Sequence, residues 1–251
     1  MKTSITINKT YQRLFKTTLA ILFWLIVWQV LSAFLGNQLL LVSPIAVAGR
    51  ILELGQTSAF WSSITASMLR ILMGYGIGVV SAIILGALGA KIPLIHHLLA
   101  PLLAVIKSAP VASFIILALV WIKSYNLSVF ISFLMVFPMV YGSVVEGIRS
   151  ANGKLLQVAK VYRFSRLKTI RLVYVPALKP TMIASLSTAV GFAWKAGITG
   201  EIFALPKAAI GTMLYNAKIY LETLDVFCWT IVIVLLSLLI EKAVRYLAHK
   251  I

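Results

Sequence analysis

Residues 64–89 have the sequence ITASMLRILMGYGIGVVSAIILGALG, in which Arg70 is the only charged residue. A helix needs about 20 mainly apolar residues to cross the hydrocarbon core of a bilayer, so this stretch predicts a membrane-spanning helix. The whole chain has the same character: of its 251 residues 61% are apolar and 12% are charged, and the mean hydropathy is +1.01. Soluble domains average about 45 to 50% apolar and about 25% charged residues, so an ordinary water-soluble protein is excluded.

Five further apolar stretches predict spans, which makes six with the first. They are 18–35, 98–122, 127–145, 181–204 and 226–240, the last extendable to about Tyr246. The first of these follows basic residues, as a secretory signal would, but it is longer than the apolar region of a signal and no clear cleavage site follows it. We therefore expect a retained helix and a single polytopic, all-α membrane domain over residues 1–251.

The basic residues are distributed unevenly around these six spans. The formal net charge is +17, from 23 Lys and Arg against 6 Asp and Glu. Sixteen of the 23 cations lie on the side of the N-terminus, four lie on the opposite side and three lie within spans. Since cytoplasmic loops carry an excess of Lys and Arg, we expect an N-in, C-in orientation, which explains the charge without nucleic acid. Cys228 is the single cysteine, which excludes an intrachain disulfide and a cysteine-rich zinc site.

Two connections between spans predict short helices. Residues 43–54 open with Ser-Pro and carry apolar residues at helical spacing, which predicts an amphipathic helix at the outer surface. The basic segment 149–180 predicts a helix pair: Asn152 is a candidate cap for the first helix, and Ser165 for a second helix that ends at Pro176. This pair could lie on anionic lipid headgroups or dock a cytoplasmic partner through its apolar stripe, and the spacing favours neither.

The segment 149–180 also carries a pattern that is known from a transporter family. Gln157-Val158-Ala159, then Arg163, then the run from Leu172 to Pro176 resemble in their spacing the EAA loop of binding-protein-dependent ABC transporter permeases. Gln, Val and Arg stand here where the family has Glu, Ala and Gly. In the family this loop contacts the ATPase, so the resemblance implies an ATPase-coupling role for Leu155, Leu156, Gln157, Val158, Ala159, Tyr162, Arg163 and Pro176.

Three further stretches resemble the nitrate, sulfonate and taurine branch of this family: 41–44, 106–121 and 193–211. The resemblance implies the type I ABC importer permease fold, with a permease core over about 60–246 and a coupling loop over 149–180. It implies a homodimer of permease subunits, cytoplasmic ABC ATPase subunits and an extracytoplasmic solute-binding protein as partners. It also implies location in the inner (cytoplasmic) membrane of a bacterial cell.

Small residues recur at every fourth position of two spans. Helices in lipid approach one another closely only through small residues, so these positions predict packing seams. Contact within one bundle is the favoured interpretation, and a dimer interface is the alternative. The first seam comprises Gly74, Gly78, Ala82 and Gly86, and the second comprises Ser185, Ala189, Ala193 and Gly197.

Charged and aromatic residues inside the spans are the candidates for a translocation pathway. A charge at the centre of a membrane helix costs about 2.5 to 3.5 kcal/mol on insertion scales, so each needs a partner or a water-filled cavity. Arg70 shares the stripe of the first seam, which favours a structural role. Two roles are open for Glu201, a water-facing gate and a packing hydrogen bond. Two roles are also open for Trp194, stacking and core packing. The candidate pathway residues are Lys107, Pro110 (expected to bend its helix), Trp194, Lys195 and Glu201.

Together these features predict a permease subunit of a bacterial ABC importer, which forms the translocation pathway for a small organic anion or related solute. No G-x-x-x-x-G-K-[ST] pattern occurs, so we expect a non-catalytic subunit without a cofactor, and ATP bound by the partner ATPase. An ion-coupled secondary transporter is the alternative, but it would show inverted repeats and buried acids. An intramembrane metalloenzyme is disfavoured, because His96 and His97 point to different faces and no metal site is expected.

Overall fold

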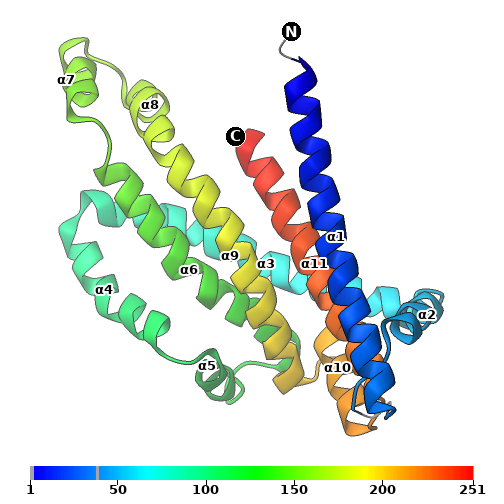
Figure 1. Cartoon of the computed structure of the whole chain (residues 1–251). Coiled ribbons are helices and arrows are strands. Elements are labelled where there is room, and N and C mark those ends of the chain that lie inside the picture. Colours follow the sequence, from blue (N-terminus) through cyan, green and yellow to red (C-terminus); the bar gives the residue numbers. More distant parts are fainter. Residues whose placement is uncertain (1–2, 38–39, 251) are drawn as a thin grey trace. The chain divides into compact units, whose positions relative to one another are not determined.

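The computed structural model describes residues 3–37 and 40–250, and within them the regular structure is entirely helical. Figure 1 shows the helices, which are joined by short connections. They are α1 (Thr3–Leu35), α2 (Pro44–Leu54), α3 (Ser58–Lys91), α4 (Pro93–Ser108), α5 (Val111–Ala118), α6 (Ser124–Arg149), α7 (Gly153–Val161), α8 (Arg166–Thr169), the π-helical turn η1 (Ile170–Tyr174), α9 (Val175–Ala204), α10 (Ile210–Ile219) and α11 (Thr223–Lys250).

The chain divides into two compact units. The first comprises Met1–Phe60 and Leu214–Ile231, and the second comprises Trp61–Met213 and Val232–Ile251. The first unit therefore contains α1 and α2, and the second contains α4 to α9; α3, α10 and α11 contribute residues to both.

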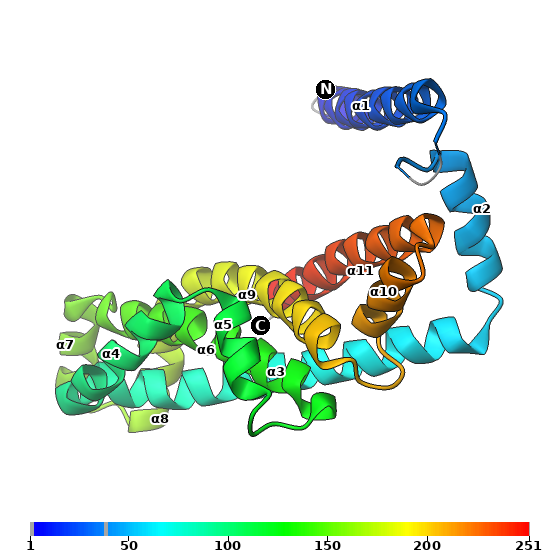
Figure 2. The same ribbon diagram turned by 90° about the horizontal axis from the view of Figure 1, so that it is seen from below.

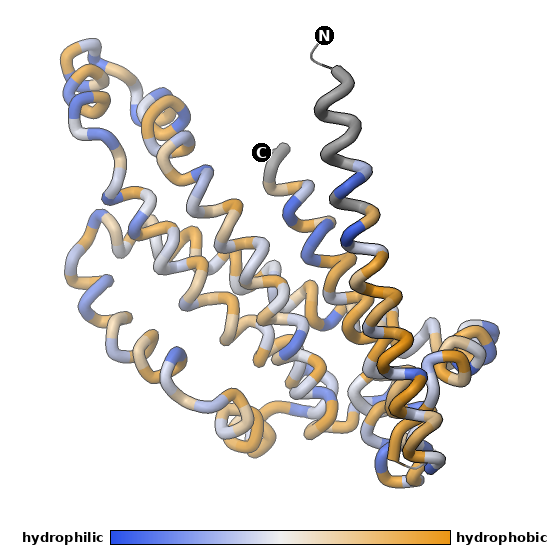
Figure 3. Tube along the Cα trace, in the orientation of Figure 1, coloured by the Kyte–Doolittle hydropathy of each residue, from blue (hydrophilic) through white to orange (hydrophobic). Residues whose placement is uncertain are grey.

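Four helices are long and apolar enough to cross a membrane, and a bent helix pair raises the number to five. Each of the four contains one of the predicted spans, which confirms that these stretches form long apolar helices. Figure 3 shows the apolar part of α1 as a mostly orange run. The four apolar segments are Phe15–Leu35, Ser58–Lys91, Ser124–Arg149 and Thr223–Ala248.

The predicted span 98–122 is broken in the structure. Its two parts, α4 and α5, meet at an angle of 106°. Ala109 and Pro110 between them have extended ψ angles of 144° and 135°. Proline lacks an N–H and disfavours the helical conformation in the residue before it, so α4 ends at Ser108 and α5 begins after Pro110. The bend expected at this proline is a complete break.

The sixth predicted span, 181–204, lies in α9, which falls outside the apolar set although it has 30 residues. Lys179, Lys195 and Glu201 lower its hydropathy, so the described helices give four or five apolar spans rather than six. The prediction that a helix ends at Pro176 is wrong. The turn η1 leads directly into α9, and Val175 N–H donates to the carbonyl of Ile170, five residues back. Such a π-turn shifts the hydrogen-bond ladder just before a residue that has no N–H to donate.

The core of the second unit forms where α3, α6 and α9 meet. Helices α6 and α9 run side by side in opposite directions in both ribbon views (Figures 1 and 2). The first seam packs α3 against α6: a Cβ atom on Gly78 would lie 2.9 Å from Cβ of Val136, and one on Gly74 would collide with the carbonyl of Val129. Ser132 of α6 donates to the carbonyl of Ala193 in α9 at 3.1 Å, so the second seam faces the same helix.

The first unit is built around α2 and the beginning of α11. Ser43 caps α2 by accepting from Ala46 N–H at 3.3 Å, which confirms the predicted short helix. Val47 of α2 is buried with Val42 and Cys228. Arg50 donates from Nε and Nη2 to both carboxylate oxygens of Asp225, at 2.7 and 3.1 Å, and this contact raises the pKa of Arg50.

Candidate coupling loop and membrane-embedded polar sites

The coupling loop contains the first short helix that its sequence predicts, and both predicted caps are confirmed. The second predicted helix begins as the four-residue α8 and continues through η1 into α9. The side chain of Asn152 accepts from Lys154 N–H at 2.9 Å, and that of Ser165 accepts from Lys168 N–H at 3.3 Å. In Figure 1, α7 and α8 lie beyond the ends of α6 and α9. Side chains on these two short helices are therefore placed where another protein can reach them.

Apolar side chains on the coupling loop are exposed rather than packed. Leu155 is 49% exposed, Tyr162 is 72% exposed and Leu167 is 79% exposed. Ala159 and Val173 are buried, at 4% and 6%, so they pack within the chain and are closed to a partner. Of the other coupling residues, Gln157, Val158, Arg163 and Pro176 are exposed and Leu156 is half-buried. This surface combines apolar side chains with the basic residues around them.

The turn that ends α7 is a complete Schellman motif. Arg163 N–H donates to the carbonyl of Lys160 at 3.2 Å, and Phe164 N–H donates to that of Ala159 at 2.8 Å. Arg163 occupies the position of this motif that is usually glycine, and its φ is +51°. A non-glycine residue in this conformation is strained by about 1 to 2 kcal/mol.

Glu201 lies at the centre of a buried polar cluster in the second unit. Arg70 donates to its Oε1 from Nε and Nη2, at 3.2 and 3.0 Å, and Ser67 donates to its Oε2 at 2.7 Å. The backbone N–H of Gly211 also donates to Oε2, at 3.2 Å, and Arg70 Nη2 donates to the carbonyl of Ala208 at 2.9 Å. Arg70 and Glu201 are 2% and 0% exposed, so this ion pair ties α3 and α9 to the start of α10.

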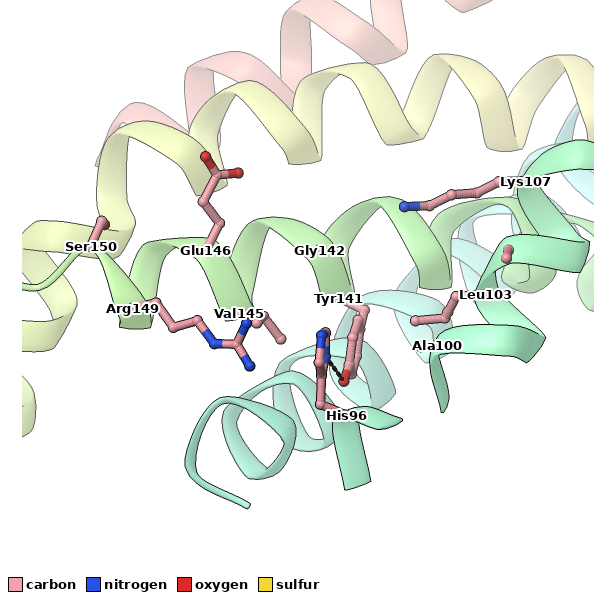
Figure 4. A pocket seen from close by; sticks show the side chains of 11 residues that line it. His96, Ala100, Leu103, Lys107, Tyr141, Gly142, Val145, Glu146, Arg149 and Ser150 are labelled. Carbon is pink, nitrogen blue, oxygen red and sulfur yellow. Dashed lines mark hydrogen bonds between the residues drawn. The ribbon is translucent and has the colours of Figure 1, made fainter. Parts of the chain in front are cut away.

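The remaining pathway candidates lie apart from that cluster. Trp194 is 1% exposed, and its Nε1–H donates to the carbonyl of Ile233 at 3.0 Å, which is core packing in this structure. Lys195 is exposed on the opposite side of α9 from its buried neighbours. Lys107 is also exposed, near the break at Pro110, and lines a cavity beside α6 (Figure 4).

A comparison with known protein families shows to which family the chain belongs. The family described as "Binding-protein-dependent transport system inner membrane component" matches residues 78–251. The chain belongs to this family. The matched region contains the coupling loop and most of the second unit.

Individual relatives are transport permeases that are similar over nearly their full length. The putative aliphatic sulfonates transport permease protein of Bacillus subtilis is 25% identical over 89% of this chain and 82% of its own. The taurine transport system permease protein of Escherichia coli is 24% identical over 89% of this chain and 83% of its own. The nitrate import permease protein of Leptolyngbya laminosa is 24% identical over 98% and 90%. These matches confirm the resemblance to ABC importer permeases of the nitrate, sulfonate and taurine branch.

Membership in this permease family gives the turn at Arg163 a physical explanation. The EAA pattern has glycine at this position, and the structure shows why: the residue must adopt a positive φ to close the Schellman motif. Arginine keeps the turn, with both of its hydrogen bonds, in spite of the strain. The departure from the family pattern therefore leaves the backbone geometry of the coupling loop intact.

The partnership of Arg70 with Glu201 was missed by sequence reasoning, which left each without an assigned partner. One signal was available: Ser63, Ser67 and Arg70 recur at helical spacing and form a polar stripe on an otherwise apolar span. That stripe marks a buried polar face, but it does not identify the partner, which lies 131 positions away in the chain.

Proposed function

We propose that this integral membrane permease is the non-catalytic transmembrane subunit of a bacterial ABC importer in the inner membrane. It forms the translocation pathway as a homodimer, couples to cytoplasmic ATPase subunits through the coupling loop, and receives solute from an extracytoplasmic binding protein. The family membership supports the permease role, and the names of the relatives favour a small anion such as a sulfonate as the solute.

The observation that carries the coupling proposal is the exposed apolar surface of the coupling loop. Leu155 and Val158 on α7 and Tyr162 at its C-cap lie at helical spacing, and all three are exposed. A short amphipathic helix with an uncovered apolar face is the element that fits a groove on a partner. A helix lying on lipid would bury the same apolar face, so the resemblance to the EAA loop is the argument that favours a protein partner.

The membrane topology that we propose has six spans with both termini in the cytoplasm. In it α4 and α5 together form one broken span, and α9 crosses as an interior helix whose polar residues contact other helices or water. The distribution of Lys and Arg supports this orientation, because it places the basic coupling loop on the cytoplasmic side. Nucleotide-driven movement of the ATPases would then shift α7 as a lever on the ends of α6 and α9.

The experiment that tests coupling is purification of the tagged chain from its native membrane in mild detergent, with mass spectrometry of what accompanies it. We expect a P-loop ATPase to co-purify. The variants Leu155→Glu and Tyr162→Glu should release it, since each places a charge on the exposed apolar face. Leu155→Met is the matched control, because it keeps an apolar side chain of similar volume, and it should retain the ATPase.

Two outcomes would contradict the proposal. A chain that purifies alone, under conditions that preserve other membrane complexes, would favour an ion-coupled transporter. If the ATPase is retained by both Glu variants but lost on neutralising Lys154 and Lys160, charge rather than the apolar face makes the contact. Comparable amounts of each variant in the membrane fraction would show that insertion is unaffected.

A further inference from the structure

The second unit contains a cavity of about 610 Å³ between α4 and α6. Figure 4 shows the side chains that line it. Three are basic (His96 and Lys107 on α4, and Arg149 at the end of α6) and one, Glu146, is acidic. Cations from two helices therefore gather around one hollow.

The arrangement of these side chains keeps the acid away from part of the basic lining. In Figure 4, Glu146 points to the opposite side of α6 from Arg149 and His96. His96 is held in place by Tyr141, with Nδ1 3.2 Å from the phenol oxygen and the two rings stacked. Among the described residues, neither Lys107 nor Arg149 forms an ion pair. The cations of the cavity are therefore available to a ligand.

The cavity extends along α4. His96 and Lys107 are eleven positions apart on this helix, which corresponds to about 16 Å at 1.5 Å per residue. Between them the wall includes the apolar side chains of Leu103 and Ala104. Apolar walls focus the field of the cations into the hollow and raise the local concentration of anions. Lys107 and Arg149 thus provide positive charge from two helices along this route.

We propose that this cavity binds the anionic group of the transported solute, a sulfonate, carboxylate or similar small oxyanion, as it leaves the membrane toward the cytoplasm. Lys107 contacts the anion at the end deeper in the membrane, and His96 and Arg149 contact it at the cytoplasmic mouth. The inference rests on the proposed function for the direction of transport. An anionic lipid headgroup has the same chemistry and is the second source of such a group.

The first test measures the electrostatic potential in the cavity with an introduced thiol. Ala104→Cys places it on the wall, and the native Cys228 is buried. We measure the rates of modification by two methanethiosulfonate reagents, one that carries a sulfonate group and one that carries a trimethylammonium group. The ratio of the two rates is then divided by the ratio that free 2-mercaptoethanol gives with the same reagents. The ratio should favour the sulfonate reagent by about tenfold, and Lys107→Gln or Arg149→Gln should lower it by about threefold or more. Lys91→Gln, which removes a cation outside this cavity, should leave it unchanged.

The second test distinguishes the two sources of the anion. The Ala104→Cys protein in nanodiscs of zwitterionic lipid is modified with uncharged N-ethylmaleimide, with and without ethanesulfonate. Protection by ethanesulfonate but not by equal chloride, lost in Arg149→Gln, supports a solute site. If anionic phosphatidylglycerol alone protects and ethanesulfonate adds nothing, the group is a lipid headgroup and the solute site is overturned.

A rate ratio equal to that of the free thiol would overturn the anion site altogether. These measurements need no ATPase, so they can fail while the ATPase still co-purifies, or succeed when it does not. Size-exclusion profiles that match the parent protein show that the variants are folded.

Discussion

The buried ion pair between Arg70 and Glu201 offers a sharp test of the fold, through the substitution Glu201→Gln. Glutamine keeps the volume and an acceptor oxygen but removes the negative charge. The guanidinium of Arg70, only 2% exposed, would then be left in the interior without a counter-charge. Removal of one partner from a buried ion pair costs about 3 to 5 kcal/mol.

The expected size of the effect follows from the contacts of this carboxylate. Glu201 accepts two hydrogen bonds from Arg70, one from Ser67 and one from the backbone of Gly211, so the loss extends to three helices. For a chain of this length about 1 kcal/mol corresponds to roughly 2 to 4 °C in Tm, so we expect a decrease of about 6 to 20 °C. The matched control is Glu53→Gln, because Glu53 is 67% exposed in its pair with Arg50 and should cost about 0.5 kcal/mol or less.

The assay is thermal unfolding of the purified protein in detergent, followed by tryptophan fluorescence, for a double-mutant cycle. Arg70→Met combined with Glu201→Gln removes both charges, and an uncharged pair in a packed interior is close to neutral. The double variant should therefore be more stable than Glu201→Gln alone. If Glu201→Gln and Glu53→Gln have equal effects, or if the double variant shows the sum of its single losses, the buried ion pair does not hold these helices together.

Three further predictions concern backbone geometry and packing. Arg163→Gly should stabilise the coupling loop by about 1 kcal/mol, because glycine adopts the positive φ without strain. The measurement is the rate of proteolysis in the loop, which should decrease, and faster cleavage would refute the strain. Gly74→Leu should abolish recovery of monodisperse protein, because the new side chain would collide with α6. Gly76→Leu should be tolerated, because a Cβ atom at that position meets nothing within 4 Å. Equal behaviour of the two variants would exclude a tight seam. Trp194→Phe should cost at least about 1 kcal/mol, because the bond to the carbonyl of Ile233 is lost and the smaller ring leaves a space in a buried site. An unchanged Tm would show that the bond contributes nothing.

Local signals in the sequence predicted where the helices of the coupling loop begin. The side chains of Asn152 and Ser165 cap helices because short polar groups satisfy the first free N–H groups, a rule that needs no tertiary information. The same kind of local rule failed at Pro176. A proline usually ends a helix, but here the turn η1 rearranges the hydrogen bonds before it and the helix continues. Which of these two solutions a chain adopts depends on the packing of the helix that follows.

The sequence pattern could not identify contacts between residues that are distant in the chain. Lys195 and Glu201 are six positions apart, about 240° around a helix of 3.6 residues per turn, so their spacing excludes an ordinary pair between them. It could not show that the partner of Glu201 lies on α3, because α3 and α9 approach closely only in the folded bundle. Apolar periodicity likewise placed Trp194 inside the membrane without indicating its hydrogen bond to α11. A one-dimensional pattern identifies buried faces, and only the fold pairs them.

The three cations within the predicted spans differ in their burial and in their ion pairing. On insertion scales each has a similar cost, about 2.5 to 3.5 kcal/mol at the centre of a span. Arg70 offsets that cost with a carboxylate inside the same unit and is fully buried. Lys107 and Lys195 are exposed and form no ion pair among the described residues, so the chain itself supplies no counter-charge for them. Such charges persist in a bilayer only beside water, another subunit or an anion. Both lysines therefore stay candidates for the translocation pathway.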